Sequence, residues 1–362
     1  APKKRKFVVF VNPHSGPGKS LKIWKTEVNH MLSEANIDVE LVITTHSNHA
    51  CDYIQNLENL LSYDGVSTIG GDGILSEVVT GISLREDGKQ IFSEVPIIPI
   101  PGGTSNGLVK SMLFASGIEY SVVNAVFLCL KGSASRLDMS LLSTASQKKY
   151  HSFLILGWGL ISNIDIMSEG MRWMGEPRLY VAAVYYILRN FRYQGKLSIL
   201  EATDDNKDFR VGDMPALTKP IPGCDVDSTT PVDIENPNPM VSNIPKTSNW
   251  KVMEGKFTMV FVAQTSHSSK SVHSGQGIDL DDGTFTIFVV REVGRCTLAS
   301  IMLSFDSGDF AKNPLVETYK ARAYRLEPLV SEKGLYSMDG EVIEYGPIQS
   351  VMMPGHAKII KM

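Results

Sequence analysis

The stretch TIGGDGILSEVV, residues 68–79, places a single carboxylate, Asp72, among three glycines directly before an apolar helical pattern. A glycine-rich turn that follows a strand and opens a helix is typical of a phosphate site, because backbone N–H groups at a helix N-terminus attract anions. A bound phosphate would repel a carboxylate in that position. We therefore expect Asp72 to have a chemical task, either as a proton acceptor or as a magnesium ligand, with a helix N-cap as the structural alternative.

Two further loops share this placement between an expected strand and an expected helix. They are NPHSGPGKS at residues 12–20 and PGGTSNG at residues 101–107. In an open parallel sheet, such loops meet at the carboxyl ends of the strands, where ligands bind. A Walker A loop needs glycine at the position of Pro13, and a dinucleotide fingerprint needs a third glycine that does not follow Gly73. The three loops together predict a phosphate cradle of another type.

The alternation of β-rich runs and helical patterns over residues 1–140 predicts a doubly wound α/β domain. Longer alternating runs over residues 141–362 predict an antiparallel β-sandwich, whose last strand could return to the first domain. The expected strands lie at 7–11, 39–44, 66–70 and 97–100, and the expected helices near 21–35, 49–61, 106–114, 120–131, 177–191 and 296–305. Residues 203–250, with seven prolines, predict a mobile insertion without chemistry.

Composition excludes several classes of protein. A net charge of −4 gives no electrostatic case for a nucleic-acid partner. The four cysteines form no CxxC pair, so neither a zinc ribbon nor a disulfide framework is indicated, and a reducing cytoplasmic setting fits best. No apolar run is long enough to span a bilayer, so contact with lipid would be peripheral.

The loops at residues 12–16, 70–73 and 101–106 are similar to the motifs of the diacylglycerol kinase superfamily. Within it, the chain resembles the sphingosine kinases in LGWGLISNIDIMSE (156–169), in residues 171–200 and in SMDGE (337–341). The resemblance covers nearly the whole chain apart from the proline-rich insertion. It implies a nucleotide-binding α/β domain joined to a β-sandwich lipid-binding domain, with ATP between them and Mg²⁺ as the accompanying ion.

The resemblance also implies site residues. Asp72 would be the general base on the primary hydroxyl of the substrate, and Asp165 would contact the sphingoid head group, with Gly70, Gly71 and Gly73 also at the substrate. The nucleotide site would comprise Asn12, Pro13, His14, Thr44, Thr45, His46, Ser47, Asn48, Glu77, Gly103, Thr104, Ser105, Arg172, Arg178, Asp339, Gly340 and Glu341. The metal ligands stay unassigned.

The sequence around Asp165 supports a contact with the sphingoid head group independently of the resemblance. It lies in the otherwise apolar segment 161–167, where a carboxylate needs a partner. The ammonium group of a long-chain base would supply one, and pairing with Arg172 or another protein cation is the structural alternative. Two positions depart from the family pattern: Ile74 stands where many lipid kinases have threonine, and His14 stands where relatives often carry arginine.

The sequence thus predicts an ATP-dependent kinase that phosphorylates the primary hydroxyl of sphingosine or a related long-chain base. The alternatives are ceramide or diacylglycerol kinase, NAD kinase more remotely, and an inactive lipid-binding scaffold. We expect a cytoplasmic protein that is recruited to the plasma membrane or another membrane surface, through apolar residues of the segment 179–192 with Arg189 and Arg192. The sequence does not decide whether the chain is a homodimer.

Overall fold

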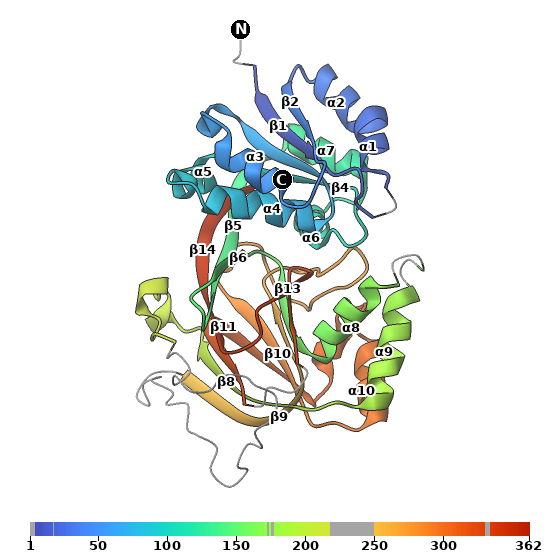
Figure 1. Cartoon of the computed structure of the whole chain (residues 1–362), viewed down its shortest axis with the longest axis vertical. Coiled ribbons are helices and arrows are strands. Elements are labelled where there is room, and N and C mark those ends of the chain that lie inside the picture. Colours follow the sequence, from blue (N-terminus) through green and yellow to red (C-terminus); the bar gives the residue numbers. More distant parts are fainter. Residues whose placement is uncertain (1–3, 17, 172–173, 175–176, 218–249, 330–333) are drawn as a thin grey trace.

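The computed structural model in Figure 1 describes residues 4–16, 18–171, 174, 177–217, 250–329 and 334–362. In these residues the strands form one continuous sheet of 14 strands that runs through both parts of the molecule. The N-terminal part is a layered α/β unit, and the C-terminal part is a larger antiparallel unit with helices on one side (Figure 1). This is the expected fold class.

The N-terminal part is built on four parallel strands in the order β4-β3-β1-β2. They are β1 (Lys6–Val11), β2 (Asp38–Ile43), β3 (Gly65–Gly70) and β4 (Ile97–Pro101). Every residue of β3 and β4 is buried, because helices cover both faces of the sheet. One group of helices is α3 (His49–Asn56), α4 (Asp72–Ser83) and α5 (Gly88–Glu94), and the other is α1 (Ser20–Ile23), the π-helical turn η1 (Trp24–Val28), α2 (Asn29–Glu34), α6 (Gly107–Ala115) and α7 (Val122–Lys131).

Antiparallel strands form the C-terminal part. They are β5 (Ser133–Thr144), β6 (Lys149–Ser152), β7 (Ile155–Gly159), β8 (Tyr193–Glu201), β9 (Trp250–Ala263), β10 (Phe285–Arg291), β11 (Val316–Pro328), β12 (Tyr336–Met338), β13 (Glu341–Ile343) and β14 (Ile348–Lys361). The long strands β9 and β11 pair with β8 over one half of their length and with β10 over the other. This change of partner folds the sheet over a core that includes Trp158 and Tyr324.

Three helices cover one side of this unit: α8 (Leu160–Glu169), α9 (Pro177–Arg189) and α10 (Arg295–Leu303) (Figure 1). They enclose a second apolar cluster against β9 and β10, in which Phe261, Phe288 and Phe310 are buried. The sequence predicted α9 and α10 but neither α8 nor α5. None of the helices in the described residues is long and apolar enough to cross a bilayer.

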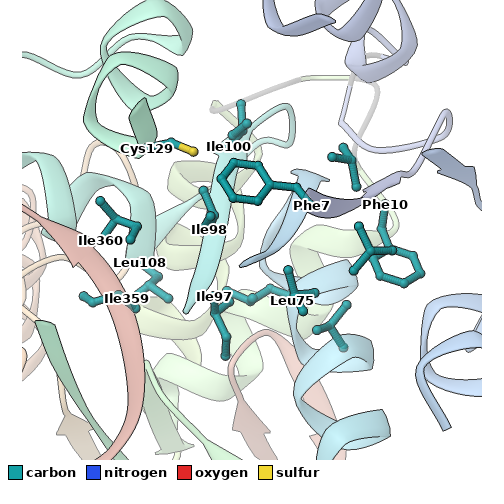
Figure 2. Packing of buried hydrophobic residues seen from close by; sticks show 14 of the residues in the cluster. Phe7, Phe10, Leu75, Ile97, Ile98, Ile100, Leu108, Cys129, Ile359 and Ile360 are labelled. Carbon is teal, nitrogen blue, oxygen red and sulfur yellow. The ribbon is translucent and has the colours of Figure 1, made fainter. Parts of the chain in front are cut away.

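The last strand joins the two parts of the molecule. β14 pairs with β11 near its beginning and with β5 along most of its length, and Ile359 pairs in parallel with Ile97 of β4. Figure 2 shows Ile359 and Ile360 in the same cluster as Phe7 of β1. Of the predicted insertion, residues 218–249 lie outside the described part, and its beginning contains two short 3-10 helices, η4 (Asp204–Asn206) and η5 (Val211–Asp213).

Candidate active site

The three glycine-rich loops come into direct contact at the carboxyl ends of β1, β3 and β4. The backbone N–H of Gly103 donates to the carbonyl of Gly70 over 2.8 Å. A Cβ atom on Gly103 would lie 2.4 Å from the Cα of Gly71, and one on Gly16 would lie 3.1 Å from the carbonyl carbon of Gly103. Glycine is therefore required because three backbones touch, which places their N–H groups at one edge of the sheet.

Asp72 lies at the centre of this edge. It is the first residue of α4, the residue is 9% exposed, and its Oδ2 accepts a hydrogen bond of 3.1 Å from the N–H of Gly107. The carboxylate therefore meets the N-terminus of α6 rather than capping its own helix, and the predicted N-cap alternative is wrong for α4. Burial raises the pKa of Asp72 to about 6, although the N–H groups of Gly107, Leu108 and Asn106 act to lower it.

The loop after β1 is held by a local turn. Asn12 Oδ1 accepts a hydrogen bond of 2.9 Å from the N–H of His14, and the hydroxyl of Ser15 accepts one of 3.4 Å from the N–H of Gly71. Asn12, Pro13 and His14 thus lie beside the loop that carries Asp72. Their contact with a nucleotide stays a prediction.

The segment 44–48 follows β2 and leads into α3. The backbone N–H of Thr45 donates to His49 Nδ1 over 3.1 Å, and Asn48 has a left-handed backbone with φ of +64°. Glu77 of α4 is half-buried, and its Oε2 accepts a hydrogen bond of 3.1 Å from the N–H of Ala50 in the first turn of α3. Glu77 therefore fixes α3, and with it this segment, to the helix that begins at Asp72.

The loop after β4 is braced by Asn106 and by a segment of the C-terminal part. Asn106 Nδ2 donates to the carbonyl of Gly103 over 2.8 Å, and its Oδ1 accepts from the N–H of the same glycine over 3.4 Å. The carbonyl of Ser105 accepts a hydrogen bond of 2.7 Å from the N–H of Lys270. Sequence reasoning missed both contacts: Asn106 stood in a quoted motif without a role, and no motif singles out Lys270.

Asp339 lies in the tight turn between β12 and β13, with φ of +52° and 3% exposure. Its carboxylate accepts four hydrogen bonds of 2.8–3.2 Å, from the hydroxyl of Ser152 and the N–H groups of Phe153, Leu154 and Ile155. Burial and the charge of Asp72 raise the pKa of Asp339 to about 6, while the N–H groups of Ile155 and Phe153 and the hydroxyl of Ser152 act to lower it. Asp339 therefore anchors the turn to the segment between β6 and β7, close enough to Asp72 for the two charges to interact.

The same turn brings Glu341 to the beginning of α4. Glu341 is exposed, and its Oε1 lies 3.6 Å from the position that a Cβ on Gly73 would occupy. Gly340, with φ of +89°, permits the sharp reversal between Asp339 and Glu341. The C-terminal turn SMDGE and the loop GGDG, far apart in sequence, thus lie side by side.

Asp165 and Arg178 lie on the helices that follow β7. The hydroxyl of Ser337 donates a hydrogen bond to Asp165 Oδ2, which connects α8 to the strand that leads to Asp339. Arg178, 7% exposed, donates from Nη1 to the carbonyl of Ser168 near the end of α8, over 3.5 Å. Arg172 lies outside the described residues. Within the described chain, no group of three or more His, Cys, Asp or Glu side chains is arranged to hold a metal ion.

Two family models match the chain. The diacylglycerol kinase catalytic domain covers residues 6–142, and the YegS C-terminal NAD kinase beta sandwich-like domain covers residues 246–361. In fold, the chain is similar to a crystal structure of a diacylglycerol kinase from Bacillus anthracis str. Sterne, with a TM-score of 0.60 and 18% identity over 100% of this chain and 98% of that chain.

Among curated proteins, sphingosine kinase 1 of Mus musculus is 30% identical over 365 residues, which cover 98% of this chain and 91% of the mouse protein. Sphingosine kinase 1 of Arabidopsis thaliana is 29% identical over 352 residues, which cover 94% of this chain and 69% of the plant protein. These matches confirm the resemblance expected from the sequence. The chain belongs to the sphingosine kinase family of lipid kinases.

Proposed function

We propose that this lipid kinase transfers the γ-phosphoryl group of ATP to the primary hydroxyl of a long-chain sphingoid base such as sphingosine, with Asp72 as the general base. The observation that carries the proposal is the position of Asp72, a buried carboxylate at the meeting point of three glycine loops and two helix N-termini. With a pKa of about 6, Asp72 is largely ionised at neutral pH, yet basic enough to accept a proton from an attacking hydroxyl.

The loops around Asp72 suit the phosphates of ATP. Phosphoryl transfer depends mainly on positioning and on stabilising the charge of the transferred group. The N–H groups of the loops at 12–16 and 101–107, with the N-termini of α4 and α6, supply fixed dipoles for that charge. Arg178, which the resemblance assigns to the nucleotide, would add a planar cation for the phosphates. The hydrogen bond from Gly107 would hold Asp72 still while the substrate oxygen attacks.

Mg²⁺ fits this site as a companion of ATP. Magnesium keeps several waters and is usually held by one or two carboxylates together with substrate phosphates. The carboxylate of Glu341 lies beside Gly73, at the exposed surface of the turn between β12 and β13. We assign Glu341 as the protein residue that would hold the ion. Bound Mg²⁺ would neutralise part of the phosphate charge.

The lipid head group would lie between Asp165 and Asp72. A cationic amine favours a carboxylate partner, and Asp165 is half-buried on α8 with one oxygen bound by the hydroxyl of Ser337. Ser337 is two residues from Asp339, whose charge interacts with that of Asp72. An ammonium at Asp165 would therefore leave the neighbouring primary hydroxyl directed toward Asp72.

The exposed face of α9 suits the surface of a membrane. Along this helix the side chains of Tyr180, Val184 and Leu188 recur every four residues and are 55%, 57% and 64% exposed. Arg189 lies next to this row, with its guanidinium 5.6 Å from the ring of Tyr185. An apolar row beside a cation is typical of a helix that lies in a membrane interface. We propose that α9 brings the enzyme to the lipid from the cytoplasmic side.

A substrate panel tests the proposed function. The protein is assayed with labelled ATP and Mg²⁺ against sphingosine, other sphingoid bases, ceramide and diacylglycerol in the same detergent micelles. We expect the long-chain bases to be phosphorylated with the highest kcat/KM, because they alone in the panel carry an ammonium for Asp165. A higher kcat/KM for diacylglycerol or ceramide would contradict the substrate assignment and leave the lipid kinase activity intact.

A further inference from the structure

A segment of the C-terminal part, residues 265–274, follows β9 and forms a narrow loop. An antiparallel bridge between His267 and His273 closes the loop. The backbone N–H of His273 donates a hydrogen bond of 3.1 Å to the carbonyl of Asp306, which comes after α10. The 265–274 segment is therefore anchored in the part of the molecule to which we assign the lipid.

The 265–274 segment lies directly against the beginning of α6. Ser269 forms an antiparallel bridge with Asn106, the residue before the helix. A Cβ atom on Gly107 would lie 2.6 Å from the carbonyl oxygen of Ser268. The absence of a side chain at Gly107 thus allows the backbone of the segment to touch the first turn of α6.

Ser111 of α6 connects the helix to this segment through hydrogen bonds. The residue is fully buried, at 0% exposure, and its hydroxyl accepts a hydrogen bond of 3.0 Å from the N–H of His267. A serine hydroxyl has one proton, and two carbonyls share it here: that of Gly107 at 3.0 Å and that of His267 at 3.3 Å. The carbonyl of His267 also accepts from the hydroxyl of Thr265 over 3.0 Å. Ser111 is therefore held between its own helix and the 265–274 segment.

Gly107 carries this connection to the proposed base. Its carbonyl accepts from Ser111, and its N–H donates to Oδ2 of Asp72 over 3.1 Å. Three hydrogen bonds of 3.0–3.1 Å thus lead from His267 through Ser111 and Gly107 to the Asp72 carboxylate. Because a hydrogen bond weakens steeply with angle, a small displacement of the first turn of α6 would release Asp72 from Gly107.

A local role for Ser111 does not explain its outer partner. A serine inside a helix often bonds the carbonyl four residues earlier, as Ser111 does with Gly107, but alanine is the better helix former. The N–H of His267 comes from outside the helix, is buried, and would lose this acceptor if residue 111 were alanine. The serine hydroxyl is therefore needed where two parts of the molecule meet.

We propose that Ser111 is a positioning residue for the phosphoryl transfer: it fastens α6 to the 265–274 segment and so holds the N–H of Gly107 on Asp72 while the substrate oxygen attacks. Ser111 acts through Gly107 rather than by touching either substrate. The part of the molecule that we assign to the lipid thereby fixes the base that acts on the lipid. The inference rests on the proposed function, since it requires Asp72 to be that base.

A double-mutant cycle between Ser111→Ala and Asp72→Asn tests the inference, with kcat for sphingosine measured by labelled ATP at saturating substrate. We expect Ser111→Ala to lower kcat by about five- to tenfold, because a base that is no longer held adopts the reactive geometry less often. The KM for sphingosine should stay within about twofold, because Asp165 keeps its hydrogen bond from Ser337. In the Asp72→Asn background no base remains to be positioned, so Ser111→Ala should lower the residual turnover by less than about twofold.

Ser67→Ala is the matched control. Ser67 of β3 is 1% exposed, and its hydroxyl donates over 2.9 Å to the carbonyl of Ile98 on β4. This substitution also removes a buried hydrogen bond from a serine to the backbone, but it leaves the contacts of α6 intact. We expect both alanine variants to lower the midpoint of thermal unfolding, and only Ser111→Ala to lower kcat.

The outcomes separate the inference from the proposed function. A wild-type kcat in Ser111→Ala, or the same fold-loss in both backgrounds, overturns the inference and leaves Asp72 as the base. An equal loss of kcat in Ser67→Ala also overturns it, because the effect would then come from stability. Nearly normal kcat in Asp72→Asn alone overturns the proposed base and the inference with it. If thermal unfolding shows that Ser111→Ala has lost its fold, Thr265→Val, which removes the other hydroxyl from the carbonyl of His267, takes its place in the cycle and is judged by the same results.

Discussion

The backbone N–H of Gly107, the first residue of α6, donates a hydrogen bond of 3.1 Å to Oδ2 of Asp72, the first residue of α4. The N-terminus of α6 is therefore directed at a carboxylate that belongs to the first residue of the neighbouring helix α4. Burial in this position raises the pKa of Asp72, and the oriented N–H groups keep the rise moderate. The result is a carboxylate whose pKa suits proton transfer close to neutral pH.

The contact between the glycine loops predicts a specific effect of Gly103→Ala. A Cβ at this position would lie 2.4 Å from the Cα of Gly71, so one of the two backbones must move. We expect kcat/KM for ATP to fall by at least tenfold and the free energy of unfolding to fall by about 1–3 kcal/mol. Steady-state kinetics and urea denaturation measure the two effects. Gly212→Ala is the control, because nothing lies within 4 Å of its Cβ; a similar loss there would mean that the effect is not steric.

Asp165→Asn tests the contact with the lipid amine. The asparagine can still accept a hydrogen bond from Ser337 but no longer carries a charge. We expect kcat/KM for sphingosine to fall by about tenfold to a hundredfold, the usual worth of a hydrogen bond to a charged group. An N-acetylated base has no ammonium, so its slower phosphorylation should be nearly unchanged. Equal losses with the charged and the neutral lipid would show that Asp165 acts on the fold instead.

A pair of histidines predicts how stability depends on pH. His151 of β6 lies 6.0 Å from the ring of Phe92 and 5.8 Å from that of His356 on β14. Burial and the neighbouring His356 lower the pKa of His151 to about 4, below its ordinary value of 6.5. The folded state thus favours neutral His151, so its contribution to stability is complete above pH 6.5 and declines as the pH falls toward 4.

His151→Phe keeps a ring in this position but cannot bind a proton. We expect the free energy of unfolding to change less steeply below pH 6.5 than in the wild type, by up to about 1.4 kcal/mol per pH unit. Guanidinium denaturation at several pH values measures the slope. His30→Phe, at an exposed position on α2, is the matched control. The prediction fails if both variants keep the wild-type slope.

The exposed row of Tyr180, Val184 and Leu188 on α9 predicts how the enzyme binds membranes. Leu188→Glu places a charge in this row. Leu84→Glu places a charge on the N-terminal part of the molecule, and the two leucines have nearly equal exposures of 64% and 63%. We expect Leu188→Glu to reduce co-sedimentation with anionic liposomes severalfold, because a charge is costly in an apolar interface. Leu84→Glu should bind as the wild type does. If both variants bind equally, α9 is not the membrane surface.

Local signals predicted the loops of the site and the elements next to them. Glycines after a buried strand have few structural roles, so the loops at 12–20, 70–73 and 101–107 could be placed from spacing alone, and the structure brings them together. The four strands of the N-terminal part, and its helices other than α5, were predicted from the periodicity of their apolar residues. The helix α8 was missed because its polar residues interrupt the apolar pattern on which a helix prediction depends.

No local pattern in the sequence predicted the contacts between distant segments. Ser152 and Asp339 are 187 residues apart, and Gln264 has no motif around it. The pairing of β14 with β4 and β5 likewise depends on a register that is set only when the core forms. The hydrogen bonds that connect Gln264, Ser152 and Asp339 therefore became visible only in the structure.

Asp72→Asn tests the central claim most directly, because the amide has nearly the shape of the carboxylate and its oxygen can still accept from Gly107. Calorimetry with a non-hydrolysable ATP analogue should give a Kd that is unchanged or lower, since a charge that repels phosphate is removed. Turnover of sphingosine by the same preparation should fall by at least a hundredfold, the usual contribution of a general base. Intact nucleotide binding with nearly normal kcat would contradict the role of Asp72 as the base.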